Sequence, residues 1–373
     1  MLFNHSQLSV AQLATVNSKM KNKFLLLLSS VLVSCVSKPD VETCVFSHED
    51  FQETKNLTSE VLKLDSVCNF NKVYCVGDSF LVANNDDPAQ KNKVQLYSLD
   101  GKRNLGGFAQ LGHSKSELVS NDIHYVQSGG DTFYVEDVVQ GKYWVCSLEL
   151  LKKGEPCVLN SFSYSKDVIN VCPLDTAYIG LDFWYSGISG YDNGIDSPLA
   201  TYSYEDGVAK HRARKYEYFV ANVAGGIVFR NPNNGDVWVA YSHDNNISIF
   251  DENMALKKKM NGPCAPERKF KTLDIKGKLY VFFERDHLID CYYDVACTGN
   301  YVYLLYRNVN AEPVPRKPKP VEILKFTWNG EPVANYKLDR YAYSISVDSE
   351  DRVLYATCVD PATSEPQFVK FAL

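Results

Sequence analysis

After its first 34 residues the sequence has no long apolar run, no long run of basic residues and no helical periodicity of useful length. Phosphate binding depends on clustered lysine and arginine, and the formal net charge is −6, so the composition argues against a nucleic-acid partner. The sequence also lacks the G-x-S-x-G, H-E-x-x-H and P-loop motifs, and no cysteine or histidine cluster has zinc-ligand spacing. We therefore expect no cofactor and no metal.

The N-terminal segment has the pattern of a lipoprotein signal. Two lysines precede the apolar run Phe24–Val33, which is too short to span a bilayer but suits the core of a signal peptide. The run ends in Leu32-Val33-Ser34-Cys35, which resembles the bacterial lipobox, whose cysteine is lipidated and becomes the new N-terminus. We predict a signal peptide over residues 1–34, with Met20 as the true start, and a lipid on Cys35. The alternative is an ordinary secretory signal with a chance cysteine.

Removal of residues 1–34 takes away three lysines and no acidic residue, so the mature chain is more acidic than the precursor. A single acyl chain holds a protein weakly, whereas a multiply acylated cysteine holds it firmly. We expect an outer-membrane lipoprotein that faces the periplasm or the cell surface, with the membrane as a partner through its lipid. The polar residues 35–58 are predicted to be a lipidated tether, and residues 59–373 the folded domain.

Ten cysteines follow Cys35, and none belongs to a C-x-x-C pair. An exported location permits disulfides, but a domain of this size does not need them to be stable. Most of these cysteines lie among strand residues, where a free thiol packs as a small hydrophobic group. We predict mostly buried free thiols. One or two bridges, for instance between Cys291 and Cys297, are the alternative.

A short pattern recurs along the chain. Its clearest copy is Gly235–Tyr241, GDVWVAY, in which a Gly-Asp turn is followed by residues apolar enough for a buried strand. A repeat of about 40–50 residues that holds several short strands is typical of propeller blades. The five further copies begin at Gly77, Gly130, Asp175, Gly299 and Asp351.

A second repeated feature is a tight turn between the outer strands of each unit. Asp100-Gly101 and Asn329-Gly330 supply the positive φ angles of a two-residue hairpin. The last unit lacks such a turn, and the alternating segment Ser59–Asp65 is predicted to complete its sheet and so remove an open edge. The sequence thus predicts an all-β fold, a six-bladed β-propeller closed by an N-terminal strand. Lys269–Glu284 is predicted to be an extra hairpin or an extended outer strand.

Residues 60–373 resemble the TolB-like six-bladed propeller lipoproteins of Bacteroidetes. The resemblance lies in the lipobox and short tether, and in the C-terminal unit from Phe326-Thr327-Trp328-Asn329-Gly330 to Leu354-Tyr355-Ala356. The turn Leu111–Glu117 departs from the usual glycine-rich G-x-G-P-x-E turn, because it lacks the second glycine and the proline. The function of that family is largely unassigned, so the resemblance implies a fold and a compartment rather than a chemistry.

Candidate binding residues come from long loops and from the starts of the inner strands. Loops on a rigid scaffold carry function, and one such loop places Phe183, Trp184 and Tyr185 among glycines. Exposed aromatic side chains bind sugar rings or protein partners; alternatively, Phe183 and Trp184 fold back and plug the propeller mouth. Polar groups that converge in a concave mouth form the default ligand site. The candidates for this mouth are Asp122, His124, Asp167, Asn170, Tyr218, Asn222, Asp290, Tyr292, Arg340 and Tyr341.

Two functional hypotheses follow. The leading one is a lipid-anchored binding or scaffold protein whose ligand is a glycan, a peptide or an envelope protein. The other is a propeller hydrolase or lyase, which would need a clustered acid/base set in the channel mouth. Three or more of Asp122, His124, Asp167, Asp290 and Arg340 lying together would favour the enzyme. No residue is identified as catalytic from the sequence, and the oligomeric state stays open.

Overall fold

The computed structural model shows an all-β protein, as predicted. It describes residues 41–64, 70–85, 89–112, 117–120, 122–124, 132–165, 168–174, 177–182, 187–192, 200–203, 225–264, 270–275, 278–283, 289–310, 319–360 and 362–373. The span Glu42–Leu373 forms one compact unit. In the described ranges, one short α-helix, α2 (Leu148–Lys152), and one 3-10 turn, η1 (His48–Asp50), accompany the strands. No helix within these ranges has both the length and the apolar character that crossing a membrane would require.

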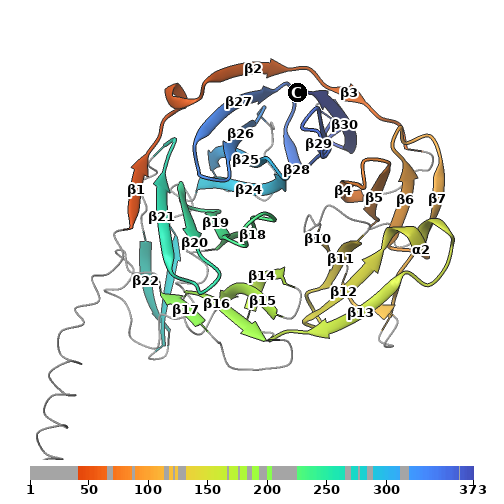
Figure 1. Ribbon diagram of the computed structural model, residues 1–373, viewed down its shortest axis with the longest axis horizontal. Coiled ribbons are helices and arrows are strands. Elements are labelled where there is room, and N and C mark those ends of the chain that lie inside the picture. The colour runs from red at the N-terminus through yellow and green to blue at the C-terminus, as the bar shows by residue number, and fades with distance from the viewer. Residues whose placement is uncertain are drawn as a thin grey trace, which may run out of the picture. The chain divides into compact units, whose positions relative to one another are not determined.

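The strands form sheets arranged in a ring around a central axis (Figure 1). In each blade the first strand lies nearest this axis and the next three follow outward, each antiparallel to its neighbour. The first blade consists of β4 (Phe70–Val76), β5 (Phe80–Asn85), β6 (Val94–Ser98) and β7 (Asn104–Phe108), and the second of β10 (Asp122–His124), β11 (Thr132–Asp137), β12 (Lys142–Ser147) and β13 (Val158–Ser163). The third consists of β14 (Val168–Pro173), β15 (Ala177–Asp182), β16 (Gly187–Asp192) and β17 (Ala200–Ser203), and the fourth of β18 (Gly226–Arg230), β19 (Val237–Tyr241), β20 (Asn246–Phe250) and β21 (Leu256–Asn261). The fifth consists of β24 (Ile289–Cys297), β25 (Tyr301–Asn310), β26 (Glu322–Thr327) and β27 (Pro332–Leu338).

The prediction of a six-bladed propeller is wrong: the propeller has five blades, each of four consecutive strands. The remaining sheet is a composite of β28 (Ala342–Val347), β29 (Val353–Val359), β30 (Pro366–Ala372) and the two-residue strand β3 (Glu60–Val61). β3 pairs antiparallel with β30, with Val61 opposite Val369, which is where the sequence places the closure. The ring therefore ends in a closing sheet whose fourth strand comes from the N-terminal part of the chain.

The N-terminal segment does more than close the ring. β1 (Glu42–Val45) pairs in parallel with β21, β2 (Glu53–Leu57) pairs in parallel with β27, and β3 follows on β30. Figure 1 shows this segment, residues 42–61, running along the outer edges of three sheets, and we call it the belt. The sequence pattern predicts a tether over residues 35–58, but residues 42–57 belong to the folded unit. Unpaired strand edges invite aggregation, and the belt covers three of them.

Three apolar side chains fix the belt to the blades. Phe46, Phe51 and Leu57 are 5%, 7% and 3% exposed and lie in the hydrophobic clusters between neighbouring sheets. The rings of Phe46 and Phe51 stand edge-on to Phe326, with centroids 5.3 and 5.5 Å away. Such edge-to-face pairs add to the energy of burial. The belt is thus part of the core, although its sequence is largely polar.

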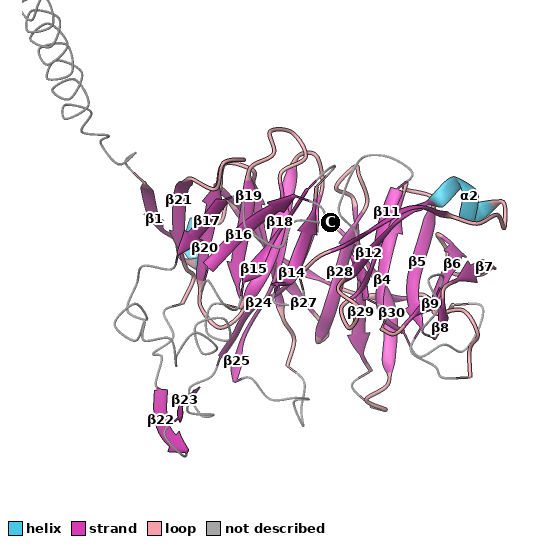
Figure 2. Ribbon diagram, turned by 90° about the horizontal axis from the view of Figure 1, so that it is seen from below, coloured by secondary structure: helices cyan, strands magenta, loops and turns pink. Residues whose placement is uncertain are grey.

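Local turn chemistry is as the sequence predicts. Gly101 has φ 73° and its N–H donates to the carbonyl of Ser98 at 2.8 Å, which closes the β6–β7 hairpin. Gly330 has φ 79°, and its N–H donates to the carbonyl of Thr327 at 2.9 Å, which closes the β26–β27 hairpin. The predicted extra hairpin is also present, as β22 (Phe270–Ile275) and β23 (Lys278–Phe283), which form a two-stranded sheet apart from the blades (Figure 2). A further short parallel pair joins β8 (Gln110–Leu111) to β9 (Glu117–Leu118).

The nine cysteines in the described ranges are free thiols, six of them buried. The alternative of a Cys291–Cys297 bridge is wrong, because both residues are free. Burial raises the pKa of the Cys75 thiol to about 12, so this thiol stays neutral and packs as a small hydrophobic group. Cys35 and Cys68 lie outside the described residues.

We predict that the belt contributes to global stability. Phe51→Ala should lower the free energy of unfolding by about 3–5 kcal/mol, because it leaves a cavity beside Phe326. The measurement is urea unfolding of the purified protein. Val45→Ala is the matched control, since Val45 lies in the same belt but is 80% exposed, and it should change stability by less than about 0.5 kcal/mol. Equal, small effects of both substitutions would contradict a packed belt.

Candidate functional site

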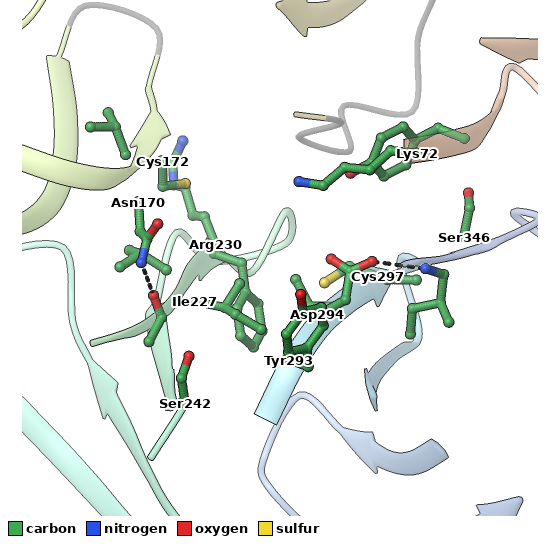
Figure 3. Close-up of a pocket in the computed structure, with 18 of the residues that line it drawn as sticks. Lys72, Asn170, Cys172, Ile227, Arg230, Ser242, Tyr293, Asp294, Cys297 and Ser346 are labelled. Carbon is green, nitrogen blue, oxygen red and sulfur yellow. Dashed lines mark hydrogen bonds between the residues drawn. The ribbon is translucent and has the colours of Figure 1, made fainter. Parts of the chain in front are cut away.

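The inner strands surround a cavity of about 350 Å³ in the central channel (Figure 3). Its lining comes from β4, β14, β18, β24 and β28, together with the start of the β19–β20 connection. A volume of this order is typical of sites for small molecules. Figure 3 shows two facing walls, one with Asn170, Cys172, Ile227, Arg230 and Ser242, the other with Lys72, Tyr293, Asp294, Cys297 and Ser346.

Hydrogen bonds between neighbouring sheets hold the polar side chains of these walls. The N–H of Ile345 donates to Asp294 Oδ2 at 2.8 Å, and Asn170 Nδ2 donates to the carbonyl of Gly226 at 2.6 Å. The N–H of Cys75 donates to Ser346 Oγ at 2.9 Å. A site whose side chains are already fixed loses less entropy when a ligand binds. The channel wall is thus preorganised.

Asp294 places an ionisable carboxyl group at a partly buried position. Burial raises the pKa of its carboxyl group, and the positive charge of Lys72 and the hydrogen bond from the Ile345 N–H partly oppose that rise. Figure 3 shows the Lys72 amine and the Asp294 carboxylate directed into the space between the walls. The two residues thus form one electrostatic unit on one side of the cavity.

A second charged group lies where the cavity meets the starts of the inner strands. His243 Nδ1 is 3.4 Å from Asp290 Oδ1, and Arg307 Nη1 is 4.0 Å from Asp290 Oδ2. Burial raises the pKa of Asp290, while the nearby His243 and Arg307 lower it. The Arg307 guanidinium lies over the rings of Tyr293 and Tyr341, at 3.1 and 4.7 Å from their centroids. Asp290 is therefore engaged by two basic side chains that are themselves held in place.

The structure separates the predicted mouth residues that it describes. Asn170 and Asp290 line the cavity. Tyr292 is fully buried in the core, where its hydroxyl donates to the carbonyl of Gly262 at 2.6 Å. Tyr341 is buried against Arg307. Arg340 Nε donates to Ser59 Oγ at 2.6 Å, and a second guanidinium nitrogen donates to Gln367, so Arg340 joins the belt to the closing sheet.

Irregular pairing explains why strict alternation misplaces these side chains. The register of β24 against β25 shifts between Asp290 and Tyr292 and again between Tyr292 and Asp294. Each shift changes which residues face the channel, as β-bulges do. As a result Asp290, Tyr293 and Asp294 line the cavity, whereas Tyr292 points into the core.

Several predicted positions cannot be placed. Asp122 and His124 lie in β10, whose backbone pairs with β11, but their side chains are outside the described set. Asp167, Tyr218, Asn222, Phe183, Trp184, Tyr185 and the lipidation site Cys35 also lie outside the described residues.

Four acidic or basic residues of the cavity are absent from the sequence-based candidates: Lys72, Arg230, His243 and Asp294. A signal was available for two of them. Asp294 interrupts the otherwise apolar and aromatic end of β24, and Arg230 ends the apolar strand Gly226–Arg230. A charge within a buried strand is costly unless it is paired or functional, so such interruptions mark candidate positions.

Metal binding finds no support in the described part of the chain, where no group of three or more His, Cys, Asp or Glu side chains could hold an ion.

Comparisons with known proteins agree with the fold. No family model matches the chain, and no curated protein sequence matches it. A crystal structure of a DUF4221 family member from Bacteroides vulgatus ATCC 8482 is similar, with a TM-score of 0.52 and 9% identity, over 85% of this chain and 95% of that one. The likeness is one of fold.

Two further solved structures, of U3-55K and of the RRP9 WD40 repeats, each have 11% identity and a TM-score of 0.45. Each match covers 84% of this chain, with 98% of U3-55K and 97% of the RRP9 repeats. Similarity this weak adds nothing to the argument about function.

The raised pKa of Asp294 predicts a pH dependence of stability. The favourable contribution of its neutral form is present below the ordinary pKa of 3.8 and is lost as pH rises through the raised value. Asp294→Asn avoids this loss and can still accept the Ile345 N–H. The variant should therefore gain stability relative to the wild type between about pH 3 and pH 7, measured as the difference in melting temperature.

Asp360 provides a control, because its pKa is shifted in the opposite direction to that of Asp294. Backbone N–H groups of Thr363 and Ala362 lower its pKa, so its contribution to stability is present above the ordinary pKa and is lost as pH falls. Asp360→Asn should be less stable than the wild type at neutral pH, and the two should converge in acid. The same trend in both variants would refute the assignment for Asp294.

Proposed function

We propose that this protein is a binding protein of the cell envelope that holds a small polar solute in its central channel. The observation that carries the proposal is the cavity of about 350 Å³, lined by charged and polar side chains from five sheets. Hydrogen bonds across the sheets fix several of those side chains, so the site is shaped before a ligand arrives.

The free-energy cost of burying charged groups in the cavity wall supports a binding role. Placing Asp290 and Asp294 where burial raises their pKa works against folding, and apolar residues at these positions would avoid that cost. Strongly perturbed groups in a cleft are candidates for function. Apolar side chains such as Ile227, Val295 and Val347 share the lining and offer contact to the carbon skeleton of a solute.

The location in the envelope is proposed from the sequence alone. The lipobox ending at Cys35 supports an outer-membrane lipoprotein, and with it membership of the TolB-like propeller lipoproteins of Bacteroidetes. The folded unit begins at Glu42 rather than at residue 59, so the tether after a lipidated Cys35 is shorter than the sequence pattern predicts. A glycan, a peptide or another envelope protein remains the kind of partner that the loops would meet.

A bulky residue in the cavity should abolish solute binding. Ile227→Trp fills the space between the walls, so stabilisation by any solute bound there should be lost. The measurement is a thermal-shift screen of small polar metabolites on residues 36–373. Val139→Trp is the matched control, because Val139 is 57% exposed and lies outside the cavity, and it should respond like the wild type. A solute that stabilises the Ile227→Trp protein as well as the wild type would refute binding in the channel.

Lipidation has its own test. In a Gram-negative host, the wild type should incorporate labelled palmitate and remain in the membrane fraction, whereas Cys35→Ala should lose both properties because the acceptor thiol is gone. Cys44→Ala is the control, since Cys44 lies in the belt and should leave labelling unchanged. Equal labelling of the wild type and Cys35→Ala would contradict the lipoprotein assignment.

A further inference from the structure

The charges that line the cavity indicate what kind of solute it binds. Five lining residues carry or can carry charge: Lys72, Arg230, His243, Asp290 and Asp294. Both carboxylates are engaged by groups of the wall. Asp290 has His243 and Arg307 beside it, and Asp294 accepts the Ile345 N–H and faces Lys72. Neither carboxylate therefore needs a cationic ligand to balance its charge.

Arg230 differs from these residues. Within the described part of the chain its guanidinium has no ion pair and no hydrogen bond. The nearest carboxylate along the chain, Asp236, is taken by Lys257, whose Nζ lies 2.7 Å from Asp236 Oδ2. Burial raises the pKa of the neighbouring Cys172 thiol to about 12, so this thiol does not neutralise Arg230.

The backbone leaves room for this guanidinium. Gly235 has φ 78°, and a Cβ there would lie 2.9 Å from Arg230 Nη2, closer than such contacts allow. A glycine at this position thus serves both the turn after β18 and the placement of Arg230. The arginine is held at the cavity by the shape of the turn, with its donors unsatisfied by the described wall.

The neutral side chains of the lining complete the pattern. Asn170 uses its amide nitrogen on the Gly226 carbonyl, so its Oδ1 can accept a hydrogen bond from a ligand. Ser346 Oγ accepts the Cys75 N–H and keeps its own hydrogen to donate. Ser242 lines the same space. An acceptor on one wall and a hydroxyl donor on the facing wall match the hydroxyl groups of a ligand that spans the space between them.

We propose that the solute is a small hydroxylated carboxylate, of which a uronic acid is the example, with its carboxylate on Arg230 and its hydroxyl groups on Asn170 and Ser346. This inference rests on the proposed binding role of the channel. Guanidinium and carboxylate form two parallel N–H···O bonds, a geometry that lysine cannot supply. Apolar lining residues such as Ile227 contact the carbon skeleton.

The test compares D-glucuronate with D-glucose, which lacks the carboxylate, by isothermal titration on residues 36–373. The wild type should bind glucuronate at least about tenfold more tightly than glucose, the loss expected when a charge-assisted pair is missing. Arg230→Gln should lose that preference and bind both sugars alike. Arg352→Gln is the control, because Arg352 is exposed and pairs with Glu350 at 2.5 Å, and it should keep the preference.

Equal affinity of the wild type for glucose and glucuronate would overturn the carboxylate assignment and leave channel binding intact. Unchanged glucuronate binding by Arg230→Gln would also overturn the carboxylate assignment. Binding of neither sugar, while another solute stabilises the wild type but not Ile227→Trp, would also overturn it. If Arg230→Gln does not fold, the comparison of the two sugars on the wild type decides the question without it.

Discussion

The pairing of the belt with the outer strands is the constraint on which the rest of the structure depends. A ring of sheets has an inner strand and an outer edge in every unit, and the C-terminal sheet has no fourth strand of its own. β3 supplies that strand, while β1 and β2 cover two further edges. Phe46, Phe51 and Leu57 secure this arrangement by burial rather than by hydrogen bonds alone. Closing the ring in this way holds the inner strands around a single channel.

The channel is where charged side chains from different sheets meet. Inner strands from five sheets bring together residues that are far apart in sequence, such as Lys72 and Asp294, or His243 and Asp290. Their charges are costly to bury, and the wall reduces that cost by pairing them across neighbouring sheets. Arg230 is the exception within the described wall, and its position is fixed by the turn at Gly235. A rigid frame thus holds one cationic side chain of the described wall without a pairing partner.

Much of the fold can be predicted because it depends on local signals. Asp100-Gly101 and Asn329-Gly330 form their hairpins, Lys269–Glu284 contains one, and the closure at Val61 and Val369 follows from the missing last turn. The belt was missed because Phe46, Phe51 and Leu57 are spaced too irregularly among polar residues to show a strand period. The six-bladed prediction was wrong for a related reason: the repeated turns mark the ends of strands, but they do not show which segment supplies an outer strand.

The candidate site was less accessible from the sequence. Asp290 was found from its place at the start of an inner strand, but Tyr292 and Arg340 were chosen by the same rule and serve the core and the closure instead. Alternation along the chain determined that this is an all-β protein with repeated hairpins, because strand and turn formation depends on neighbouring residues. The tertiary structure alone decided which charges share the channel, because bulges in β24 and contacts between distant sheets set the direction of each side chain.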